Sequence, residues 1–292
     1  MAHSASPLRD YIQLIRLDRP VGIWLLLWPT LWALWWAAEG WPPWPVLTVF
    51  VLGTVLMRSA GCAINDVADR KVDPHVRRTA DRPIAAGRLT AHQGVVTAAL
   101  LALVALLLLL SLRSPLAVAW SVPAVLLAAV YPLMKRVVDL PQAVLGLAFS
   151  WGMPMAWAVL QGTVPVWPVA LLMAANVAWV IAYDTYYAMA DREDDARIGV
   201  RSSARWFGRH DRAAVLSLNL LALVLLAGVG RTAGFGPAYF GGLVVALGLM
   251  AAAHWQTRRR DPQACFAAFK RSHWQGAAIW LGLVLEFGST AA

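Results

Sequence analysis

The sequence predicts an all-α, polytopic membrane protein with about nine transmembrane helices, and three observations lead to this fold class. Of the 292 residues, 60% are hydrophobic and only 14% are charged, whereas soluble domains carry about 25% charged residues. Long apolar runs alternate with short polar segments, and the runs are long enough to cross a bilayer. The 16 tryptophans also suit a membrane protein, since indole rings settle at the bilayer–water interface. We expect an outer interfacial belt of tryptophans at Trp32, Trp35, Trp36, Trp41 and Trp44.

The positive charges indicate which loops lie inside the cell. The formal net charge is +9, and Lys and Arg fall in the N-terminal segment and in alternate loops, with Arg58, Arg113 and Arg231 as exceptions. This alternation follows the positive-inside rule. Membrane topology therefore accounts for the basic character. We expect no nucleic-acid partner, and we expect the N-terminus to lie inside.

The elements follow in order along the chain. Residues 1–19 form a polar leader with an amphipathic, interfacial helix within 8–19. A kink is expected at Gly152 and Pro154. Residues 1–292 are expected to form a single integral-membrane domain. The predicted spans are 20–38, 46–66, 91–112, 116–134, 142–160, 167–187, 213–229, 237–255 and 274–285.

Two inner loops, about 66–90 and 188–212, begin with acidic clusters. Asp66, Asp69 and Asp73 lie at i, i+3 and i+7, which places them on one face of a helix. The second cluster repeats the spacing at the end of the sixth span, with Asp184, Tyr187 and Asp191. Carboxylates beside lipid are costly, so they normally face a polar cavity, a partner charge or a metal ion.

The paired clusters predict a site for a magnesium-bound diphosphate. Mg²⁺ prefers oxygen ligands, and it commonly binds through a few carboxylates and substrate phosphate oxygens. The five aspartates are the expected metal ligands and catalytic groups. Asn65 adds an amide oxygen, and Tyr187 is a candidate to bind phosphate or substrate, with a packing role as the alternative. The basic residues expected to hold the phosphates are Lys71, Arg77, Arg82, Lys135, Arg136, Arg192 and Arg201.

These residues carry a family resemblance. Asn65-Asp66-x-x-Asp69-x-x-x-Asp73 and Asp184-x-x-Tyr187-Ala188-x-x-Asp191 resemble the two aspartate-rich motifs of the UbiA superfamily of intramembrane prenyltransferases. The match is closer still to the 4-hydroxybenzoate polyprenyltransferases of bacterial ubiquinone biosynthesis. The further stretches that are similar to this subfamily are 19–22, 27–33, 56–62, 131–136, 140–142 and 182–185.

The resemblance implies a central cavity capped by the two motif loops, dependence on Mg²⁺, and a long polyprenyl diphosphate as donor. It implies that Asn65 and the five aspartates bind the metal–diphosphate, and that the prenyl chain lies in an apolar groove open to membrane lipid. The acceptor would be 4-hydroxybenzoate, alkylated ortho to its hydroxyl, with Asp191 as a candidate to receive the ring proton. The expected location is the bacterial inner membrane, with the N-terminus and motif loops in the cytoplasm.

An anionic acceptor needs a positive partner. Arg58 lies within the second span, about 10 Å deeper than Asn65 on roughly the same face at 1.5 Å per residue. An arginine within a membrane span is usually functional. We therefore predict that Arg58 binds the acceptor carboxylate, with a structural pairing as the alternative. Arg19 is a second candidate.

Two other functions remain as alternatives. Within the superfamily, the acceptor could be a naphthoate, a haem or a chlorophyllide, although an intramembrane arginine favours a small acid. The second alternative is a transporter. Transporters usually place charged residues near the bilayer midplane, whereas here the acidic residues gather at one surface.

Overall fold

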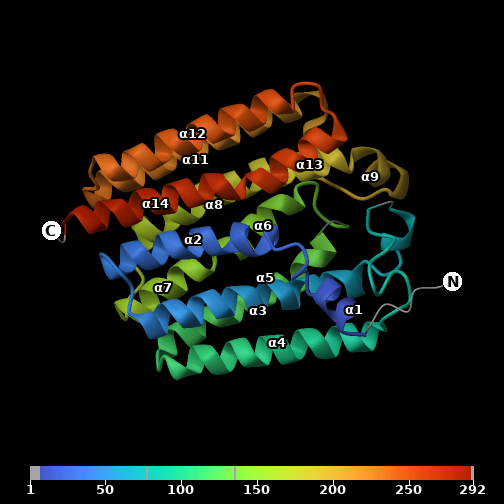
Figure 1. Ribbon diagram of the computed structural model, residues 1–292, viewed down its shortest axis with the longest axis horizontal. Helices are drawn as coiled ribbons and strands as arrows, with labels where there is room; N and C mark the ends of the chain where they lie inside the picture. Colours follow the sequence, from blue (N-terminus) through green and yellow to red (C-terminus); the bar gives the residue numbers. More distant parts are fainter. Residues whose placement is uncertain (1–6, 77, 135, 291–292) are drawn as a thin grey trace.

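The computed structural model describes residues 7–76, 78–134 and 136–290, and it is a bundle of long, roughly aligned helices (Figure 1). The described residues contain no strand. The elements are α1 (Pro7–Leu14), α2 (Val21–Ala38), α3 (Trp44–Ala68), η1 (Asp73–His75), α4 (Ala91–Ser111), α5 (Pro115–Met134), α6 (Pro141–Ser150), α7 (Gly152–Leu160), α8 (Val166–Ala190), α9 (Arg192–Ile198), α10 (Ser203–Phe207), η2 (Gly208–His210), α11 (Asp211–Ala233), α12 (Pro237–Gln256), α13 (Pro262–Arg271) and α14 (His273–Thr290).

The predicted membrane spans agree closely with these helices. Within the described part of the chain, eight segments are long and apolar enough to cross a membrane. They correspond to the first eight predicted spans. The ninth prediction, 274–285, lies inside α14, which is not among those eight segments. However, α14 runs from the end of the bundle that carries α13 to the opposite end (Figure 1), so it also traverses the bundle.

The predicted kink in the fifth span is confirmed. Helix α6 ends at Ser150 and α7 begins at Gly152, with Trp151 between them. Pro154 explains the break, because it has no amide hydrogen and its ring crowds the carbonyl of Ser150, four residues earlier. Gly152 also packs against Thr30 of α2, since a Cβ atom at Gly152 would lie 2.9 Å from the Thr30 Oγ1 atom. The kink thus brings α7 close to α2.

The largest cluster of buried hydrophobic residues draws on α2, α8, α12 and α14, with further residues from α3, α7 and α11. Trp32 and Trp35 are 1% and 2% exposed and belong to this core, so the prediction that they form an interfacial belt is wrong. The Trp32 Nε1 atom donates a hydrogen bond of 3.0 Å to the carbonyl of Gly276. Similarly, Trp179 donates to the Gln275 side chain at 2.8 Å. Indoles can be buried here because α14 supplies an acceptor for each of these two rings.

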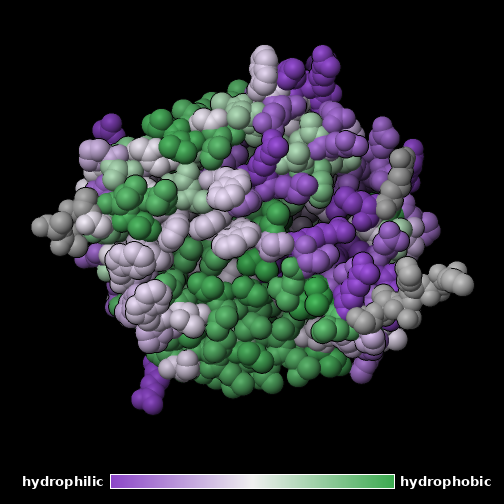
Figure 2. Space-filling model, viewed as in Figure 1, coloured by the Kyte–Doolittle hydropathy of each residue, from purple (hydrophilic) through white to green (hydrophobic). Residues whose placement is uncertain are grey.

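The surface divides into a hydrophilic end and a hydrophobic flank. In the view of Figure 2, hydrophilic residues gather at the end that carries α1 and α9, and a broad hydrophobic area lies beside them. Helices α4 and α5 contribute many exposed leucines and valines to the molecule's surface. Such a large apolar surface is expected where lipid is the solvent.

Candidate active site

A cavity of about 1360 Å³ connects the hydrophilic end to the middle of the bundle. On α3 its lining extends from Asp66 back to Val49, which is about 25 Å along the helix at 1.5 Å per residue. The wall at the hydrophilic end carries aspartates and arginines, and the deeper wall is mainly apolar. The cavity therefore offers a polar compartment and an apolar arm.

The apolar arm reaches the lipid-facing surface between α4 and α5. Leu106 of α4 and Val122, Val125 and Leu126 of α5 all line the cavity. The same four side chains are 40%, 57%, 48% and 60% exposed. An apolar chain in this arm would thus meet the bilayer without crossing a polar layer.

The first acidic cluster lies at the polar end. Helix α3 ends at Ala68, and Asp69 follows as its C-terminal cap, while Asp73 begins the short helix η1. The prediction that all three aspartates lie on one continuous helix is therefore wrong. Pro74 has no amide hydrogen with which to continue an α-helical ladder. The turn is held by the Asp73 amide, which donates to the Asp69 carbonyl at 2.9 Å.

The tight turn nevertheless brings the three carboxylates to one place. Asp66, Asp69 and Asp73 all line the cavity and are 1%, 7% and 4% exposed. The second cluster is built in the same way, because α8 ends at Ala190 and Asp191 caps it. Asp184, Tyr187 and Asp191 line the same cavity. Both clusters therefore line one cavity, and their shared role in binding a metal–diphosphate stays a prediction.

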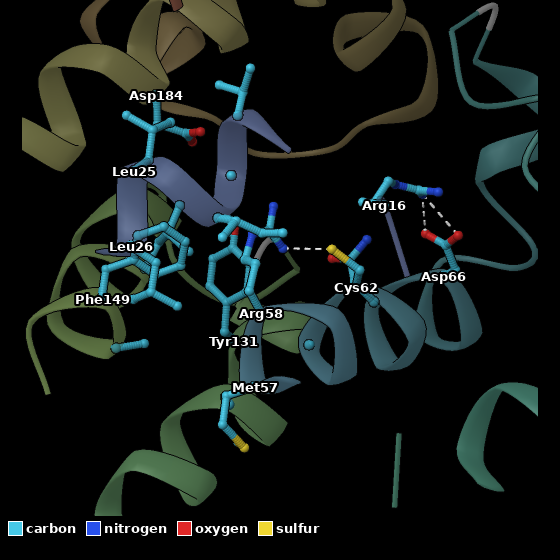
Figure 3. Close-up of a pocket in the computed structure, with 18 of the residues that line it drawn as sticks. Arg16, Leu25, Leu26, Met57, Arg58, Cys62, Asp66, Tyr131, Phe149 and Asp184 are labelled. Atoms are coloured by element: carbon cyan, nitrogen blue, oxygen red, sulfur yellow. Dashed lines mark hydrogen bonds and ion pairs between the residues drawn. The ribbon is translucent and has the colours of Figure 1, made fainter. Parts of the chain in front are cut away.

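Arginines pair with the carboxylates of the first cluster. Arg82 lies 3.1 Å from Asp66 and 2.8 Å from Asp73, and so joins the two carboxylates. Arg16 of the leader binds Asp66 through both carboxylate oxygens, at 2.7 and 2.9 Å (Figure 3). Asn65 donates to Asp69 at 3.1 Å. A buried carboxylate needs such partners, because desolvation of an unpaired charge is costly.

Arg78 connects the first loop to the second cluster. Its guanidinium binds both oxygens of Asp191, with one bond of 3.0 Å from Nε. The same group lies over the ring of Tyr187, 4.2 Å from the centroid. This arrangement combines a bidentate ion pair with a cation–π contact. The two motif loops are therefore linked directly across the cavity.

Burial and charge shift the pKa values in this compartment. Burial raises the pKa of Asp73, and the nearby Arg82 only partly opposes this effect. For Arg78, burial lowers the pKa, but the Tyr187 and Asp191 side chains outweigh it and the pKa rises. The pKa of Arg82 also rises, because the neighbouring carboxylates outweigh its burial. Both arginines stay positively charged and can hold anionic phosphate oxygens.

The donor atoms fit a magnesium ion that is shared with a phosphate. Within 7–76, 78–134 and 136–290, no group of three or more His, Cys, Asp or Glu side chains is arranged to hold a metal alone. Mg²⁺ usually takes only one or two carboxylates from a protein and completes its shell with water and phosphate oxygens. The carboxylate oxygens of the two clusters and the adjacent arginines therefore suit a metal–diphosphate better than a metal alone.

Only some of the other residues predicted to bind diphosphate line the cavity. Tyr187, Arg82 and Arg201 line the cavity, whereas Lys71, Arg136 and Arg192 do not. Arg77 and Lys135 lie outside the described residues. The three outliers have other surroundings, which explains their absence from the wall. Lys71 is exposed, Arg136 donates to the Ala68 carbonyl at 2.9 Å, and Arg192 pairs with the buried carboxylate of Asp211.

Arg58 lies deeper in the cavity, as predicted (Figure 3). It donates to the Cys62 sulfur at 2.7 Å and lies 5.9 Å from the centre of the Phe149 ring. Among the described residues, no ion pair joins Arg58 to a carboxylate, so the alternative of a structural pairing with an acid is not found there. Arg19 lines the mouth of the cavity, where its side chain is 70% exposed and pairs with Asp18 at 3.4 Å.

Several residues of the cavity wall were not predicted as site residues. Among them are Arg16, Arg78, Tyr183 and Lys270. Arg78 stands beside the predicted Arg77, and a run of adjacent arginines gives no signal that separates them. Arg16 and Lys270 come from segments far from both motifs, so only the folded chain reveals them. Tyr183 lies within a motif-like stretch but precedes the first aspartate of its cluster.

Known proteins resemble this chain over nearly its whole length. The model of the UbiA prenyltransferase family matches residues 26–281. The 4-hydroxybenzoate octaprenyltransferase of Azotobacter vinelandii is 52% identical, over 96% of this chain and 94% of its own. That of Nitrosomonas europaea is also 52% identical, over 97% and 96%.

Solved structures share the fold. The apo structure of a UbiA homolog from Aeropyrum pernix K1 has a TM-score of 0.76 at 21% identity, covering 90% of this chain and 97% of that one. The structure of a UbiA homolog from Archaeoglobus fulgidus bound to GPP and Mg²⁺ has a TM-score of 0.69 at 15% identity, covering 94% and 99%. At these identities the likeness concerns the fold, and it confirms the predicted all-helical architecture.

Proposed function

Because the chain belongs to the UbiA prenyltransferase family, we propose that it transfers a polyprenyl group from polyprenyl diphosphate to 4-hydroxybenzoate. The new bond forms at the ring carbon ortho to the hydroxyl, and the product is the 3-polyprenyl-4-hydroxybenzoate of ubiquinone biosynthesis. One observation carries the proposal. A single cavity holds two facing acidic clusters at its polar end and an apolar arm that reaches lipid.

The polar compartment binds the diphosphate of the donor. Asp66, Asp69, Asp73, Asp184 and Asp191 hold Mg²⁺ together with phosphate oxygens, and Asn65, which bonds to Asp69, supports that carboxylate. When bound, the metal neutralises the charge that develops on the diphosphate as its bond to carbon breaks. The arginines and Tyr187 bind the remaining phosphate oxygens, with Arg82, Arg78 and Arg201 in position to do so.

The prenyl chain occupies the apolar arm between α4 and α5. The relatives named above use an octaprenyl donor, so octaprenyl diphosphate is the first donor to test. The apolar wall also excludes water from the reacting carbon, which protects an electron-poor allylic centre from hydrolysis.

The acceptor binds below the diphosphate. Arg58 holds its carboxylate, since this guanidinium faces the cavity without an acidic partner in the described chain. Arg19, exposed at the mouth, is the weaker candidate and guides the anion inward. As the carbon–carbon bond forms and diphosphate leaves, the ring proton passes to a carboxylate, for which Asp191 is our candidate.

The whole chain acts as one integral-membrane domain of the bacterial inner membrane. The N-terminus and both motif loops face the cytoplasm, because the positive charges concentrate at that end. This orientation presents the polar compartment to cytoplasmic 4-hydroxybenzoate and Mg²⁺. The charged groups collect at one end of the cavity, which argues against a transporter with a midplane site.

An acceptor screen tests the proposal. Purified protein in lipid, with Mg²⁺ and octaprenyl diphosphate, is given labelled 4-hydroxybenzoate or a hydroxynaphthoate. We expect prenylated, organic-extractable product from 4-hydroxybenzoate. Product from the naphthoate alone would assign the other acceptor class, and no product from either acid with any donor would contradict the proposal.

A further inference from the structure

Tyr183 carries a buried hydroxyl without a hydrogen-bond partner in the described part of the chain. Its side chain is 2% exposed and lines the cavity. The Tyr183 hydroxyl makes no hydrogen bond within the described residues. Buried polar groups without a partner are rare, because each one costs its desolvation energy. The Tyr186 hydroxyl is in the same state away from the cavity, whereas Tyr183 lies at the cavity wall, where a ligand atom can complete its hydrogen bonding.

The ring of Tyr183 is fixed in this orientation by its neighbours. It meets Trp179 of α8 edge-on, with centroids 5.0 Å apart, and it lies 6.1 Å from the ring of Phe269 of α13. Such edge contacts restrict rotation of the side chain. The hydroxyl is therefore held in place before any ligand binds.

Arg58, which lines the same cavity, shows the same property at one atom. Its Nε atom is also buried and has no hydrogen-bond partner within the described chain. The guanidinium is held against the backbone of Gly22, since a Cβ atom there would lie only 2.5 Å from Nε. Tyr183 and Arg58 line the same cavity. Two side chains from α8 and α3 thus line one cavity, and each has one donor atom without an acceptor in the described chain.

We propose that Tyr183 is a further acceptor-binding residue, whose hydroxyl donates a hydrogen bond to the same carboxylate that Arg58 holds. A carboxylate has two oxygens and accepts several hydrogen bonds, so it satisfies both donors at once. This inference rests on the proposed function and adds a second residue to the recognition of an aromatic acid. Tyr183 positions the acceptor and takes no part in proton transfer.

Tyr183→Phe tests the role, and Tyr186→Phe is the matched control. Tyr186 lies on the same helix and is also fully buried, but it belongs to a separate core cluster with Ala204 and Cys265 and does not line the cavity. A hydrogen bond to a charged group implies a KM for 4-hydroxybenzoate that rises ~10- to 100-fold in Tyr183→Phe. The KM for the donor should stay within about twofold, and Tyr186→Phe should change neither value.

Direct binding measurements distinguish a failure of this inference from a failure of the proposed function. The affinity of purified protein for 4-hydroxybenzoate, measured by calorimetry without donor, should fall in Tyr183→Phe as far as KM rises. Its affinity for methyl 4-hydroxybenzoate, which lacks the charged carboxylate, should be the same in both proteins. Wild-type protein that binds the acid and gives no product would contradict the proposed function alone. Unchanged affinity in Tyr183→Phe would overturn the role of Tyr183.

A double-variant cycle guards against an indirect effect of the substitution. If both residues bind one carboxylate, Tyr183→Phe should weaken acid binding much less in an Arg58→Ala background than in wild type. If the affinity losses of the two single variants simply multiply in the double variant, the two residues do not bind one carboxylate. Because the hydroxyl has no hydrogen-bond partner among residues 7–76, 78–134 and 136–290, Tyr183→Phe should keep the wild-type Tm, which excludes misfolding as the cause.

Discussion

Arg78 binds both carboxylate oxygens of Asp191, although 113 positions separate the two residues in sequence. The same guanidinium covers the ring of Tyr187 at 4.2 Å. One side chain from the first motif loop therefore fixes two residues of the second. The relative position of the acidic clusters depends on this contact, since the loops come from α3 and α8.

Arg78→Ala is expected to lower kcat/KM for the polyprenyl diphosphate by ~100-fold or more, because a bidentate charged pair is lost. Arg78→Lys should recover little, since an ammonium cannot form the planar, two-point contact. Steady-state kinetics with varied donor measures both. Arg70→Ala is the control, because Arg70 is exposed in the same loop and donates only to the Val67 carbonyl. Equal losses in the two alanine variants would contradict the role of Arg78.

Chelation of magnesium should stop turnover reversibly. EDTA is expected to abolish product formation, and excess Mg²⁺ should restore it. Asp191→Asn should reduce kcat by at least ~100-fold, because a neutral amide binds a hard cation far more weakly than a carboxylate does. Activity that survives EDTA in the wild type would exclude the proposed metal site. An unchanged Tm in Asp191→Asn would confirm that the variant is folded.

Gly22→Ala should weaken acceptor binding without touching the acceptor. The added methyl group would lie 2.5 Å from the Arg58 Nε atom, so the guanidinium must move. We expect the KM for 4-hydroxybenzoate to rise ~10-fold, as for a lost charged hydrogen bond, and the KM for the donor to stay constant. Gly53→Ala is the control: Gly53 also lines the cavity, but a Cβ there meets nothing within 4 Å. Identical kinetics in both variants would refute the steric argument.

Asp211→Asn should destabilise the fold more than it affects binding. This fully buried carboxylate pairs with Arg192 and lies 2.9 Å from Arg260. Its neutralisation leaves two arginines uncompensated, at a cost of about 2–3 kcal/mol, which is reduced because both arginines are partly exposed. A lower Tm in detergent would register the loss. Asp139→Asn, which removes a pair between largely exposed side chains, should leave the Tm unchanged.

Cys265 should resist alkylation at neutral pH. Burial raises the pKa of its thiol to about 11, and the nearby Asp211 and Asp261 add to the shift. Since the thiolate is the reactive form, roughly one molecule in a thousand or fewer is reactive at pH 7.5. In Cys62→Ser, where Cys265 is the remaining cysteine, maleimide should label the native protein only as the pH approaches the raised pKa. Rapid labelling at pH 7.5 would contradict the raised pKa of the Cys265 thiol.

The sequence alone predicted most of the fold because hydropathy and charge report directly on membrane crossings. It also placed five aspartates in one cavity, since their spacing and the positive-inside rule assign both clusters to the same side. The prediction failed where a local signal that ends a helix competes with a helical spacing of residues. Asp66, Asp69 and Asp73 follow a helical period, yet α3 ends at Ala68.

The sequence also did not predict in which direction each side chain points on an apolar helix. Tyr183, Tyr186 and Tyr187 are near neighbours on α8, which is buried over most of its sides. Hydropathy therefore gives no preferred face, and only packing decides that Tyr183 and Tyr187 reach the cavity while Tyr186 does not. The buried Trp32 and Trp35 follow the same logic, because an indole suits a protein interior as well as an interface.

The exposed leucines and valines that line the cavity between α4 and α5 determine by which route the donor and the product of the proposed reaction enter and leave. The donor arrives, and the product departs, by lateral diffusion within the lipid phase, whereas the acid arrives from bulk water. Saturation by donor therefore depends on its mole fraction in the bilayer and not on its amount per volume of assay. Dilution with additional phospholipid should slow the enzyme at constant total substrate, and accumulated product should inhibit it until a later enzyme in the same membrane removes that product.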